Sequence, residues 1–270
     1  MTKKSQISIL APPAKPLATH GKSQKLHNKL LQIVKKKRSD LLEQKKNRGT
    51  FKEKMLSSKN IALIAEIKLA SPSISSLGSE DNIVQRAIAY EQAGADAISV
   101  ITEKHFFKGD VSFIPRVKQQ VTIPILQKDF VIDPYQIYEA KMIGSDAILL
   151  IARLINKDIL KNFVAQSLKI GIEPIVEIND EEDLEKAVAT TTSFIAVNAR
   201  DLRTLTIDIS KACTLLKKIP KKFIKLGFSG IHSSSEVKKY KEAGAKGVLV
   251  GTSLMKTANI HSFINDLKSI

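Results

Sequence analysis

The chain has 270 residues, of which 43% are hydrophobic and 26% are charged, and its formal net charge is +16. This composition supports a large apolar core, and no apolar run reaches the roughly 20 residues that span a bilayer, so we expect no membrane insertion. The only cysteine, Cys213, excludes an intrachain disulfide and favours the reducing cytoplasm.

The basic residues are concentrated near the N-terminus. Residues 1–60 contain 16 lysines and arginines against 3 acidic residues, so +13 of the net charge of +16 lies there. Residues 1–25 show little periodicity and are predicted to form a disordered basic tail. Residues 26–44 carry apolar side chains at helical spacing, which predicts an extra helix that packs against the domain and exposes the basic residues 35–38. Nucleic-acid binding by this segment is the less favoured alternative.

Eight short apolar runs follow, and segments with helical spacing separate them. Strands that are buried on both faces have this nearly continuous, β-branched character. The runs are residues 61–68, 97–102, 124–130, 147–153, 173–179, 194–200, 224–230 and 247–253. Glycines end several intervening helices, at Gly94, Gly144, Gly171 and Gly244. Asp133 and Ser233 have the type and position of helix N-caps.

Eight alternations of strand and helix predict an α/β fold, a (β/α)8 TIM barrel that forms a single domain over residues 26–270 with the extra helix at 26–44. A doubly wound open sheet is the competing fold. That fold usually has a glycine-rich phosphate loop after its first strand. Residues 66–73, at the end of the first run and just beyond it, contain no glycine, so this loop is absent.

Charged and amide residues occur at the C-terminal ends of four of these runs. They are Glu66, Lys68, Lys128, Glu177, Asn198 and Arg200. Because a barrel of parallel strands brings these ends to one rim, we expect the side chains to converge there. Glu66 and Lys68 are two residues apart and so face the same side of their strand. A structural salt bridge explains that pair taken alone, whereas charges at corresponding ends of four strands favour a catalytic site.

Two turns near the end of the chain predict a phosphate site. Ser229 and Gly230 follow the seventh run, and Gly251 and Thr252 lie at the end of the eighth. Many barrels hold a phosphate with backbone N–H groups of these two loops and the start of a short extra helix, because glycine permits close approach. Ordinary turn chemistry is the alternative for either loop alone.

An ordered series of motifs resembles the indole-3-glycerol-phosphate synthase family of tryptophan biosynthesis, over roughly residues 26–265. The motifs are Ala65-Glu66-Ile67-Lys68 with Ser71-Pro72-Ser73, Ser99-Val100-Ile101-Thr102 with Phe106-Phe107-Lys108-Gly109, Pro124-Ile125-Leu126-Gln127-Lys128-Asp129-Phe130, Glu177-Ile178-Asn179, Val197-Asn198-Ala199-Arg200-Asp201-Leu202, Ser229-Gly230-Ile231 and Gly251-Thr252-Ser253-Leu254-Met255. Each motif is common, but their order and spacing are specific. Residues 1–25 have no counterpart in the family.

The resemblance implies ring closure of 1-(2-carboxyphenylamino)-1-deoxyribulose 5-phosphate, with loss of carbon dioxide and water. It implies no redox cofactor and no metal, and the five histidines show no metal-ligand spacing. By the same resemblance, Lys128 is the general acid and Glu177 the acid/base group for dehydration. Lys68 and Arg200 bind the substrate's anionic groups.

The resemblance also assigns supporting positions. Glu66 and Asn198 position a catalytic lysine and the sugar hydroxyls, and Ser71 belongs with the substrate-binding residues. An apolar slot for the aromatic ring is formed by Phe107, Phe130, Leu149 and Leu202, for which core packing is the alternative. Association with other enzymes of the tryptophan pathway is a further expectation.

One departure from the family pattern bears on activity. Phe228 stands where the family usually carries glutamate, and a phenyl ring neither accepts a hydroxyl hydrogen bond nor balances a lysine charge. Leu69, in place of a usual basic residue, is a lesser departure. Phe228 and the basic N-terminus leave open a weakly active or inactive barrel that binds phosphate or nucleic acid. A phosphoribosylanthranilate isomerase, which shares the predicted barrel and phosphate site, is a further alternative. The isomerase would need a cysteine on the first strand, where this chain has Glu66 and Lys68.

Overall fold

A computed structural model of the chain describes residues 29, 31–36, 39 and 49–270. The chain divides into two units, residues 1–47 and 48–270. In the first unit, residues 29, 31–36 and 39 are helical and lie within the predicted helix 26–44, and Leu31, Ile33 and Val34 are exposed. The remaining residues of the predicted helix and the predicted tail 1–25 lie outside the described residues.

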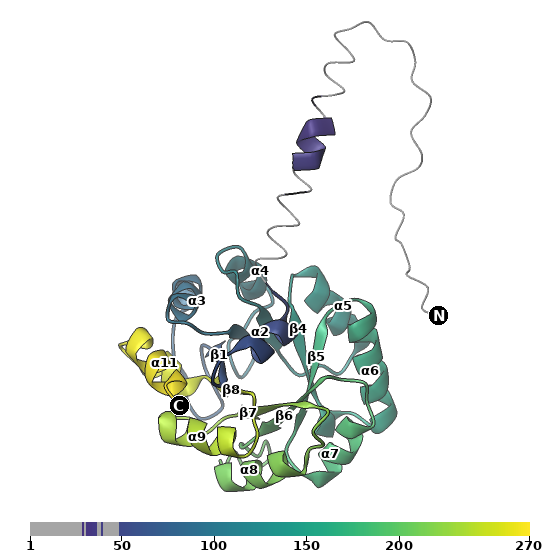
Figure 1. Cartoon of the computed structure of the whole chain (residues 1–270), viewed down its shortest axis with the longest axis vertical. Coiled ribbons are helices and arrows are strands. Elements are labelled where there is room, and N and C mark those ends of the chain that lie inside the picture. Colours follow the sequence, from purple (N-terminus) through teal and green to yellow (C-terminus); the bar gives the residue numbers. More distant parts are fainter. Residues whose placement is uncertain (1–28, 30, 37–38, 40–48) are drawn as a thin grey trace, which may run out of the picture. The chain divides into compact units, whose positions relative to one another are not determined.

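The second unit contains a closed barrel of eight parallel strands, in which β1 pairs with both β2 and β8 (Figure 1). The strands are β1 (Ala62–Ile67), β2 (Ala97–Ile101), β3 (Ile125–Lys128), β4 (Ala147–Ile151), β5 (Glu173–Ile178), β6 (Phe194–Asn198), β7 (Ile224–Phe228) and β8 (Gly247–Val250). The predicted TIM barrel is confirmed, and the open sheet is wrong. Each strand ends one to three residues before the end of the apolar run that predicted it. Several of the predicted site residues therefore lie just beyond a strand end.

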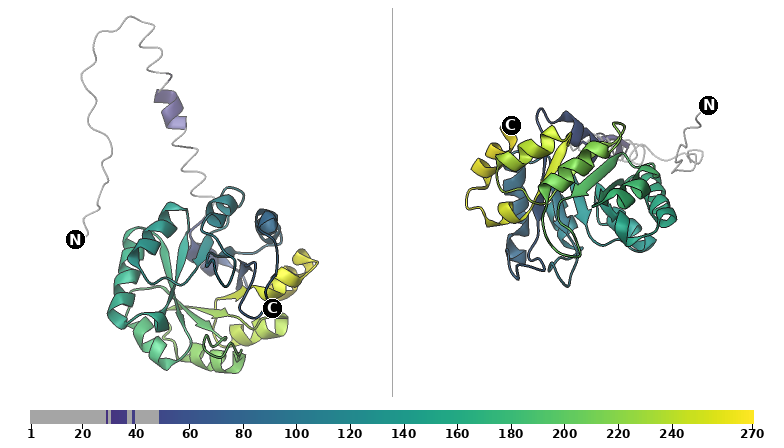
Figure 2. Two further views of the ribbon diagram at one scale, coloured as in Figure 1. Left: turned by 180° about the vertical axis from the view of Figure 1, so that it is seen from behind. Right: turned by 90° about the horizontal axis from the view of Figure 1, so that it is seen from below.

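Helices follow the strands and surround the barrel (Figure 2). They are α2 (Phe51–Ser57), α3 (Ile83–Gln92), α4 (Phe113–Lys118), α5 (Pro134–Met142), α6 (Lys157–Lys169), α7 (Glu181–Val188), α8 (Ile209–Lys218), α9 (Ser234–Glu242), α10 (Thr252–Lys256) and α11 (Ile260–Lys268), with 3-10 turns η1 (Glu80–Asn82) and η2 (Ala152–Leu154). Within the described residues, none of the helices has the length and apolar character needed to cross a membrane.

The predicted helix boundaries are confirmed at their caps. Asp133 and Ser233 each form a capping box, with Gln136 and Glu236 respectively. The glycines that follow α3, α5, α6 and α9 have φ between 73° and 97°, a left-handed conformation that glycine adopts without a steric cost. These local signals end each helix at a fixed residue and so determine where the next strand starts.

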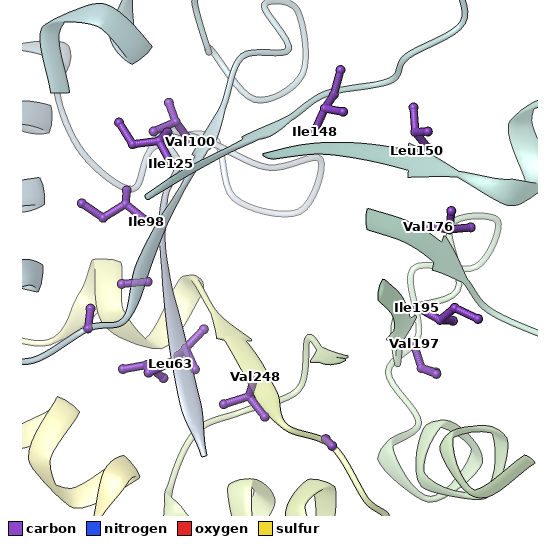
Figure 3. Packing of buried hydrophobic residues seen from close by; sticks show 14 of the residues in the cluster. Leu63, Ile98, Val100, Ile125, Ile148, Leu150, Val176, Ile195, Val197 and Val248 are labelled. Carbon is purple, nitrogen blue, oxygen red and sulfur yellow. The ribbon is translucent and has the colours of Figure 1, made fainter. Parts of the chain in front are cut away.

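Alternate strand residues pack in opposite directions and form two apolar clusters. One set points outward against the helices, and Figure 3 labels ten of its members. The other set fills the lumen: Ala62, Ile64, Ala97, Leu126, Ala147, Leu149, Ile151, Ile175, Phe194, Ala196, Leu226, Phe228 and Leu249. The lumen is therefore a packed core and not a pore, and the side chains at the C-terminal rim rest on it.

Helix α2 closes the N-terminal end of the barrel with Phe51 and Met55, which are buried in the lumen cluster. The rings of Phe51 and Phe194 meet edge to face with centroids 5.4 Å apart. An ideal Cβ on Gly247, the first residue of β8, would lie 3.3 Å from Met55 Sδ. The short helix is therefore part of the core rather than a surface addition.

Phe51→Ala is expected to lower the free energy of unfolding by about 3–5 kcal/mol, because it removes a buried ring and leaves a cavity at the end of the lumen. Equilibrium unfolding in urea measures this loss. Leu56→Ala, on the exposed side of the same helix with 54% of the leucine exposed, is the control and should change stability by less than about 0.5 kcal/mol. Equal losses in the two variants would show that α2 does not close the barrel.

Candidate active site

Glu66, at the end of β1, is the centre of a group of charges at the C-terminal rim. Its side chain is 2% exposed, and its two carboxylate oxygens approach two different lysines. Lys68 Nζ lies 2.9 Å from Glu66 Oε1, and Lys128 Nζ lies 3.1 Å from Glu66 Oε2. Lys68 directly follows β1 and Lys128 is the last residue of β3, so the structure brings these two strand ends together as predicted.

The environment of Glu66 determines the charge state of this group. Burial by itself would raise the pKa of Glu66, but attraction from Lys128 and Lys68 outweighs burial and lowers it to about 2. Burial lowers the pKa of Lys128, whereas attraction from Glu66 and Glu177 exceeds that effect and leaves the pKa raised. Lys128 is therefore protonated at neutral pH and able to donate a proton.

Glu177, at the end of β5, is the second buried carboxyl of the rim, 3% exposed. Asn198 Nδ2 from β6 donates to Glu177 Oε1 at 3.1 Å, while Glu177 Oε2 has no hydrogen-bond partner among the described residues. Burial raises the pKa of Glu177, and Lys128 and Asn198 oppose that rise without cancelling it. A carboxyl with a raised pKa and one unpaired oxygen is suited to exchanging a proton with a ligand.

Two adjoining cavities lie at this rim. The larger has a volume of about 290 Å³. Its lining includes predicted catalytic, substrate-binding and phosphate-binding residues: Glu66, Lys68, Ser71, Phe107, Lys128, Phe130, Asn198, Arg200, Leu202, Ser229, Gly230, Gly251 and Thr252. The smaller, of about 50 Å³, adds Glu177 and Leu149 and shares Lys128 and Asn198 with the larger. All fifteen side chains and turn residues that the sequence singled out therefore line one or both cavities.

The apolar part of the larger cavity combines aliphatic side chains with three phenylalanines, Phe106, Phe107 and Phe130. The rings of Phe107 and Phe130 are tilted at 44° with centroids 6.4 Å apart. Leu202 is partly buried beside the lumen cluster, whereas Leu149 lies 1% exposed within it and contacts only the smaller cavity. Leu149 is therefore both a residue of the packed core and part of the lining of the smaller cavity.

The two predicted phosphate loops are held together. Ser253 Oγ in α10 donates to the backbone oxygen of Ile231 at 2.7 Å, which ties the loop after β8 to the loop after β7. Ser229 and Gly230 both have positive φ, 70° and 79°, and this directs the chain sharply away from the end of β7. Ser71, in the loop after the neighbouring β1, lines the same cavity.

Gly251 illustrates how closely backbone and acid approach each other here. An ideal Cβ on Gly251 would lie 2.1 Å from Glu66 Oε1 and 3.0 Å from Lys68 Nζ. The glycine is therefore required by the position of the Glu66 carboxylate, and not only by the turn.

Gly251→Ala is expected to lower kcat/KM by at least about tenfold, because the new methyl group must displace Glu66 from its two lysines. Steady-state assays of the full chain measure the loss. Gly78→Ala is the matched control, since its Cβ would meet only side-chain ends, Met255 Cε at 3.0 Å and Leu69 Cδ2 at 3.6 Å, and should leave kcat/KM nearly unchanged. Full activity in Gly251→Ala would mean that the close approach is unimportant.

One supporting residue was missed from the sequence. The carboxylate of Glu103, in the loop after β2, accepts hydrogen bonds from the backbone N–H groups of His105, Phe106 and Phe107 at 2.8–3.0 Å. It thereby shapes the loop that brings Phe107 to the cavity. An acidic residue in a loop is too common to signal this role, so only the folded loop reveals it.

Phe228 lies in the lumen cluster with 1% of its surface exposed, and its Cα pairs with that of Asn198. It does not line either cavity. Leu69 is 7% exposed and belongs to the outer cluster between barrel and helices. Both departures from the family pattern are therefore buried as apolar core.

Among the described residues, no group of three or more histidines, cysteines, aspartates and glutamates is arranged to hold a metal ion. The site consists of two buried carboxyls at one rim of a closed barrel, of which Glu66 pairs with two lysines and Glu177 accepts from Asn198. Fold and site together define a TIM-barrel enzyme with its reaction centre at the C-terminal rim.

The family follows from comparison with known proteins. A family model described as indole-3-glycerol phosphate synthase matches residues 19–267. The indole-3-glycerol phosphate synthase of Caldanaerobacter subterraneus subsp. tengcongensis is 46% identical over 209 residues, which cover 77% of this chain and 81% of that protein. The synthase of Endomicrobium trichonymphae is 40% identical and covers 86% of this chain and 90% of its own length. The chain belongs to the indole-3-glycerol phosphate synthase family.

Solved structures support the fold alone, because their sequences are distant. A 3-hexulose-6-phosphate synthase has a TM-score of 0.64 at 13% identity, covering 77% of this chain and 99% of that one. A chain of a tryptophan synthase complex from Pyrococcus furiosus has a TM-score of 0.59 at 18% identity, covering 78% and 99%.

Proposed function

We propose that the protein is an active indole-3-glycerol-phosphate synthase, a carbon–carbon carboxy-lyase that acts on 1-(2-carboxyphenylamino)-1-deoxyribulose 5-phosphate. The observation that carries the proposal is the pairing of Glu66 with Lys68 and Lys128 beside the Glu177–Asn198 pair, all facing adjoining cavities. Family membership supports the same substrate.

The proposed reaction begins with attack of the carboxyl-bearing aryl carbon on the sugar carbonyl carbon. The carbonyl electron pair moves to oxygen, which takes a proton from the ammonium group of Lys128. The new carbon–carbon bond breaks the aromaticity of the ring, and loss of carbon dioxide restores it. The hydroxyl group then leaves as water, with Glu177 exchanging the proton that this step requires.

The proposed anion contacts divide between two parts of the larger cavity. The phosphate binds between the loops after β7 and β8, at Ser229, Gly230, Gly251 and Thr252, where backbone N–H groups and the start of α10 favour an anion. Lys68 and Arg200 bind anionic groups of the substrate, and the rings of Phe107 and Phe130 contact its aryl ring.

Indole formation tests the proposal directly. Purified full-length protein is mixed with the carboxyphenylamino-deoxyribulose phosphate without added metal, and indole absorbance and fluorescence are recorded with release of carbon dioxide. We expect turnover to one indole-3-glycerol phosphate and one carbon dioxide per substrate. No indole signal at saturating substrate would reject the proposal.

Phe228→Glu is expected to raise kcat by at least about tenfold, because a carboxylate level with Asn198 can accept a substrate hydroxyl hydrogen bond, and such single contacts are worth about 100- to 1,000-fold. The melting temperature should fall, since a charge replaces an apolar ring in the lumen. Phe228→Leu removes the ring without adding a carboxylate and is the control. If kcat is equal in the two variants, another group already performs this function.

The alternative binding function was predicted from the basic N-terminus, most of which lies outside the described residues. Family membership favours the enzyme over that alternative. Association with other enzymes of tryptophan synthesis stays a prediction.

A further inference from the structure

We propose that Asn179 is a positioning residue for the reaction, because its side-chain amide clamps the end of β6 and thereby holds Asn198 against Glu177. The proposal rests on the function proposed above and assigns a role to a residue that touches neither of the two rim cavities. It concerns the junction between β5 and β6, where two of the proposed active-site residues are adjacent.

The backbone pairing of β5 and β6 ends just before this junction. The last pair of Cα partners is Ile178 with Val197, one residue short of Asn198. Beyond it, Asn179 Nδ2 donates to the backbone oxygen of Asn198 at 2.7 Å and to that of Arg200 at 3.2 Å. One side-chain amide thus continues the connection where the ladder has stopped.

The clamped segment carries the contact to Glu177. Asn198 Oδ1 accepts from the backbone N–H of Arg200 at 3.0 Å, which leaves Asn198 Nδ2 directed at Glu177 Oε1. Fixing both carbonyls therefore fixes the orientation of the Asn198 amide. A loss of the clamp frees the segment that places this amide, and displacements of about 1 Å at a reacting group can cost about 100-fold in rate.

Asn179 itself is held independently of its amide. Its backbone N–H donates to Asp183 Oδ2 at 2.9 Å, and Asp183 is 2% exposed and paired with Arg153 at 3.0 Å. The main chain at Asn179 therefore stays in place when the side chain is shortened. Asn179 Oδ1 is buried without a hydrogen-bond partner among the described residues, so the amide is used here through its donors.

A polar cavity of about 210 Å³ lies on the other side of the junction, lined in part by Asn179, Asn198, Asp201 and Asp208. The end of β6 is therefore not packed tightly from that side. On its β7 side the same segment is held by the backbone, where the Ala199 N–H donates to the Phe228 oxygen at 2.9 Å. The amide clamp is therefore the contact that joins the end of β6 to β5, the strand that carries Glu177.

The opposite end of the same strand pair offers a matched control. Thr192 Oγ1 donates to the backbone oxygen of Pro174 at 2.7 Å and bridges the starts of β5 and β6. Thr192→Val removes a side-chain bridge to a carbonyl from the same two strands, far along the barrel from the rim. A purely structural effect should be similar in the two positions.

The experiment compares Asn179→Ala, Asn179→Asp and Thr192→Val with the unaltered full chain. We expect both Asn179 variants to lose at least about tenfold in kcat, with KM changed less than about threefold, because the Arg200 guanidinium has its own anchor on Leu205 O at 2.8 Å. Thr192→Val should keep both constants within about twofold at a temperature where all the variants are folded. Equal kcat in Asn179→Ala and the unaltered chain, or equal losses in Asn179→Ala and Thr192→Val, would overturn the proposal.

A second measurement does not depend on turnover. Hydrogen exchange followed by mass spectrometry should show faster exchange over residues 198–203 in Asn179→Ala but not in Thr192→Val. Unchanged exchange there would overturn the clamp even if no activity were detected. Absence of indole formation by the unaltered chain, with faster exchange in Asn179→Ala, would instead reject the proposed function and leave the clamp standing.

Discussion

Replacing Lys128 by glutamine is expected to lower kcat by about 10²- to 10⁴-fold, the range typical of a general acid. The amide cannot supply a proton to the carbonyl oxygen during ring closure. Glu66 keeps its contact with Lys68, so the paired carboxylate does not become an isolated buried charge. Stopped assays with product quantification are sensitive enough to measure the residual rate.

The Lys128→Arg variant shows whether activity depends on proton donation by residue 128 or only on its positive charge. A guanidinium keeps the positive charge near Glu66 but releases its proton far less readily than an ammonium, so kcat should remain low. Lys104→Gln, at an exposed position in the loop after β2, removes one positive charge from the same rim and should retain nearly full activity. A Lys128→Gln variant within tenfold of the unaltered enzyme would mean that another group donates the proton.

Glu177→Gln is expected to cause a loss of similar size, about 10²- to 10⁴-fold in kcat. The substitution preserves shape and the contact with Asn198 but abolishes proton exchange during loss of water. Glu173→Gln is a matched control on the same strand and the same face, at the opposite end of the barrel, where burial also raises the pKa of the carboxyl. That variant should keep kcat within about twofold, and similar losses in both would indicate a general effect of altering β5.

The pH profile gives an independent test of Glu177. Burial raises its pKa above the usual value of 4.5, and the ionised form that accepts a proton exists only above the raised pKa. We therefore expect kcat of the unaltered enzyme to fall as the pH decreases through a value above 4.5. In Glu177→Gln this acid limb should be absent. An identical limb in that variant would assign the titration to a different group.

The Phe228 position shows how a departure from a family pattern is absorbed by the core. The ring is buried with Leu226 and Leu249 in the lumen, so the substitution exchanges a polar rim contact for apolar packing at the same level as Asn198. The stability gained from a filled lumen and the turnover lost at the rim are expected to oppose each other. The Phe228→Glu and Phe228→Leu pair measures both quantities.

Much of the fold could be read from local sequence signals. Apolar runs with β-branched residues gave the eight strands, and caps such as Asp133, Ser233 and Gly94 gave the helix ends, because these signals act within a few residues of the chain. The strand ends were placed one to three residues too late, as at Ser253, which lies in α10. The apolar run continues past the strand because the residues after the last backbone pair of the sheet are still buried or half-buried at the rim.

The sequence by itself determined which residues have suitable chemistry and that parallel strands would bring them to one rim: Glu66, Lys68, Lys128 and Glu177 were identified by type and by their place at the ends of apolar runs. Only the tertiary structure decided which of them pair, that Gly251 must lack a side chain because of the Glu66 carboxylate, and that Asn179 continues the β5–β6 connection. The physical reason is that hydrogen bonds and ion pairs between strands require residues far apart in the chain to be placed to within a few tenths of an ångström. Periodicity and residue type do not specify such distances.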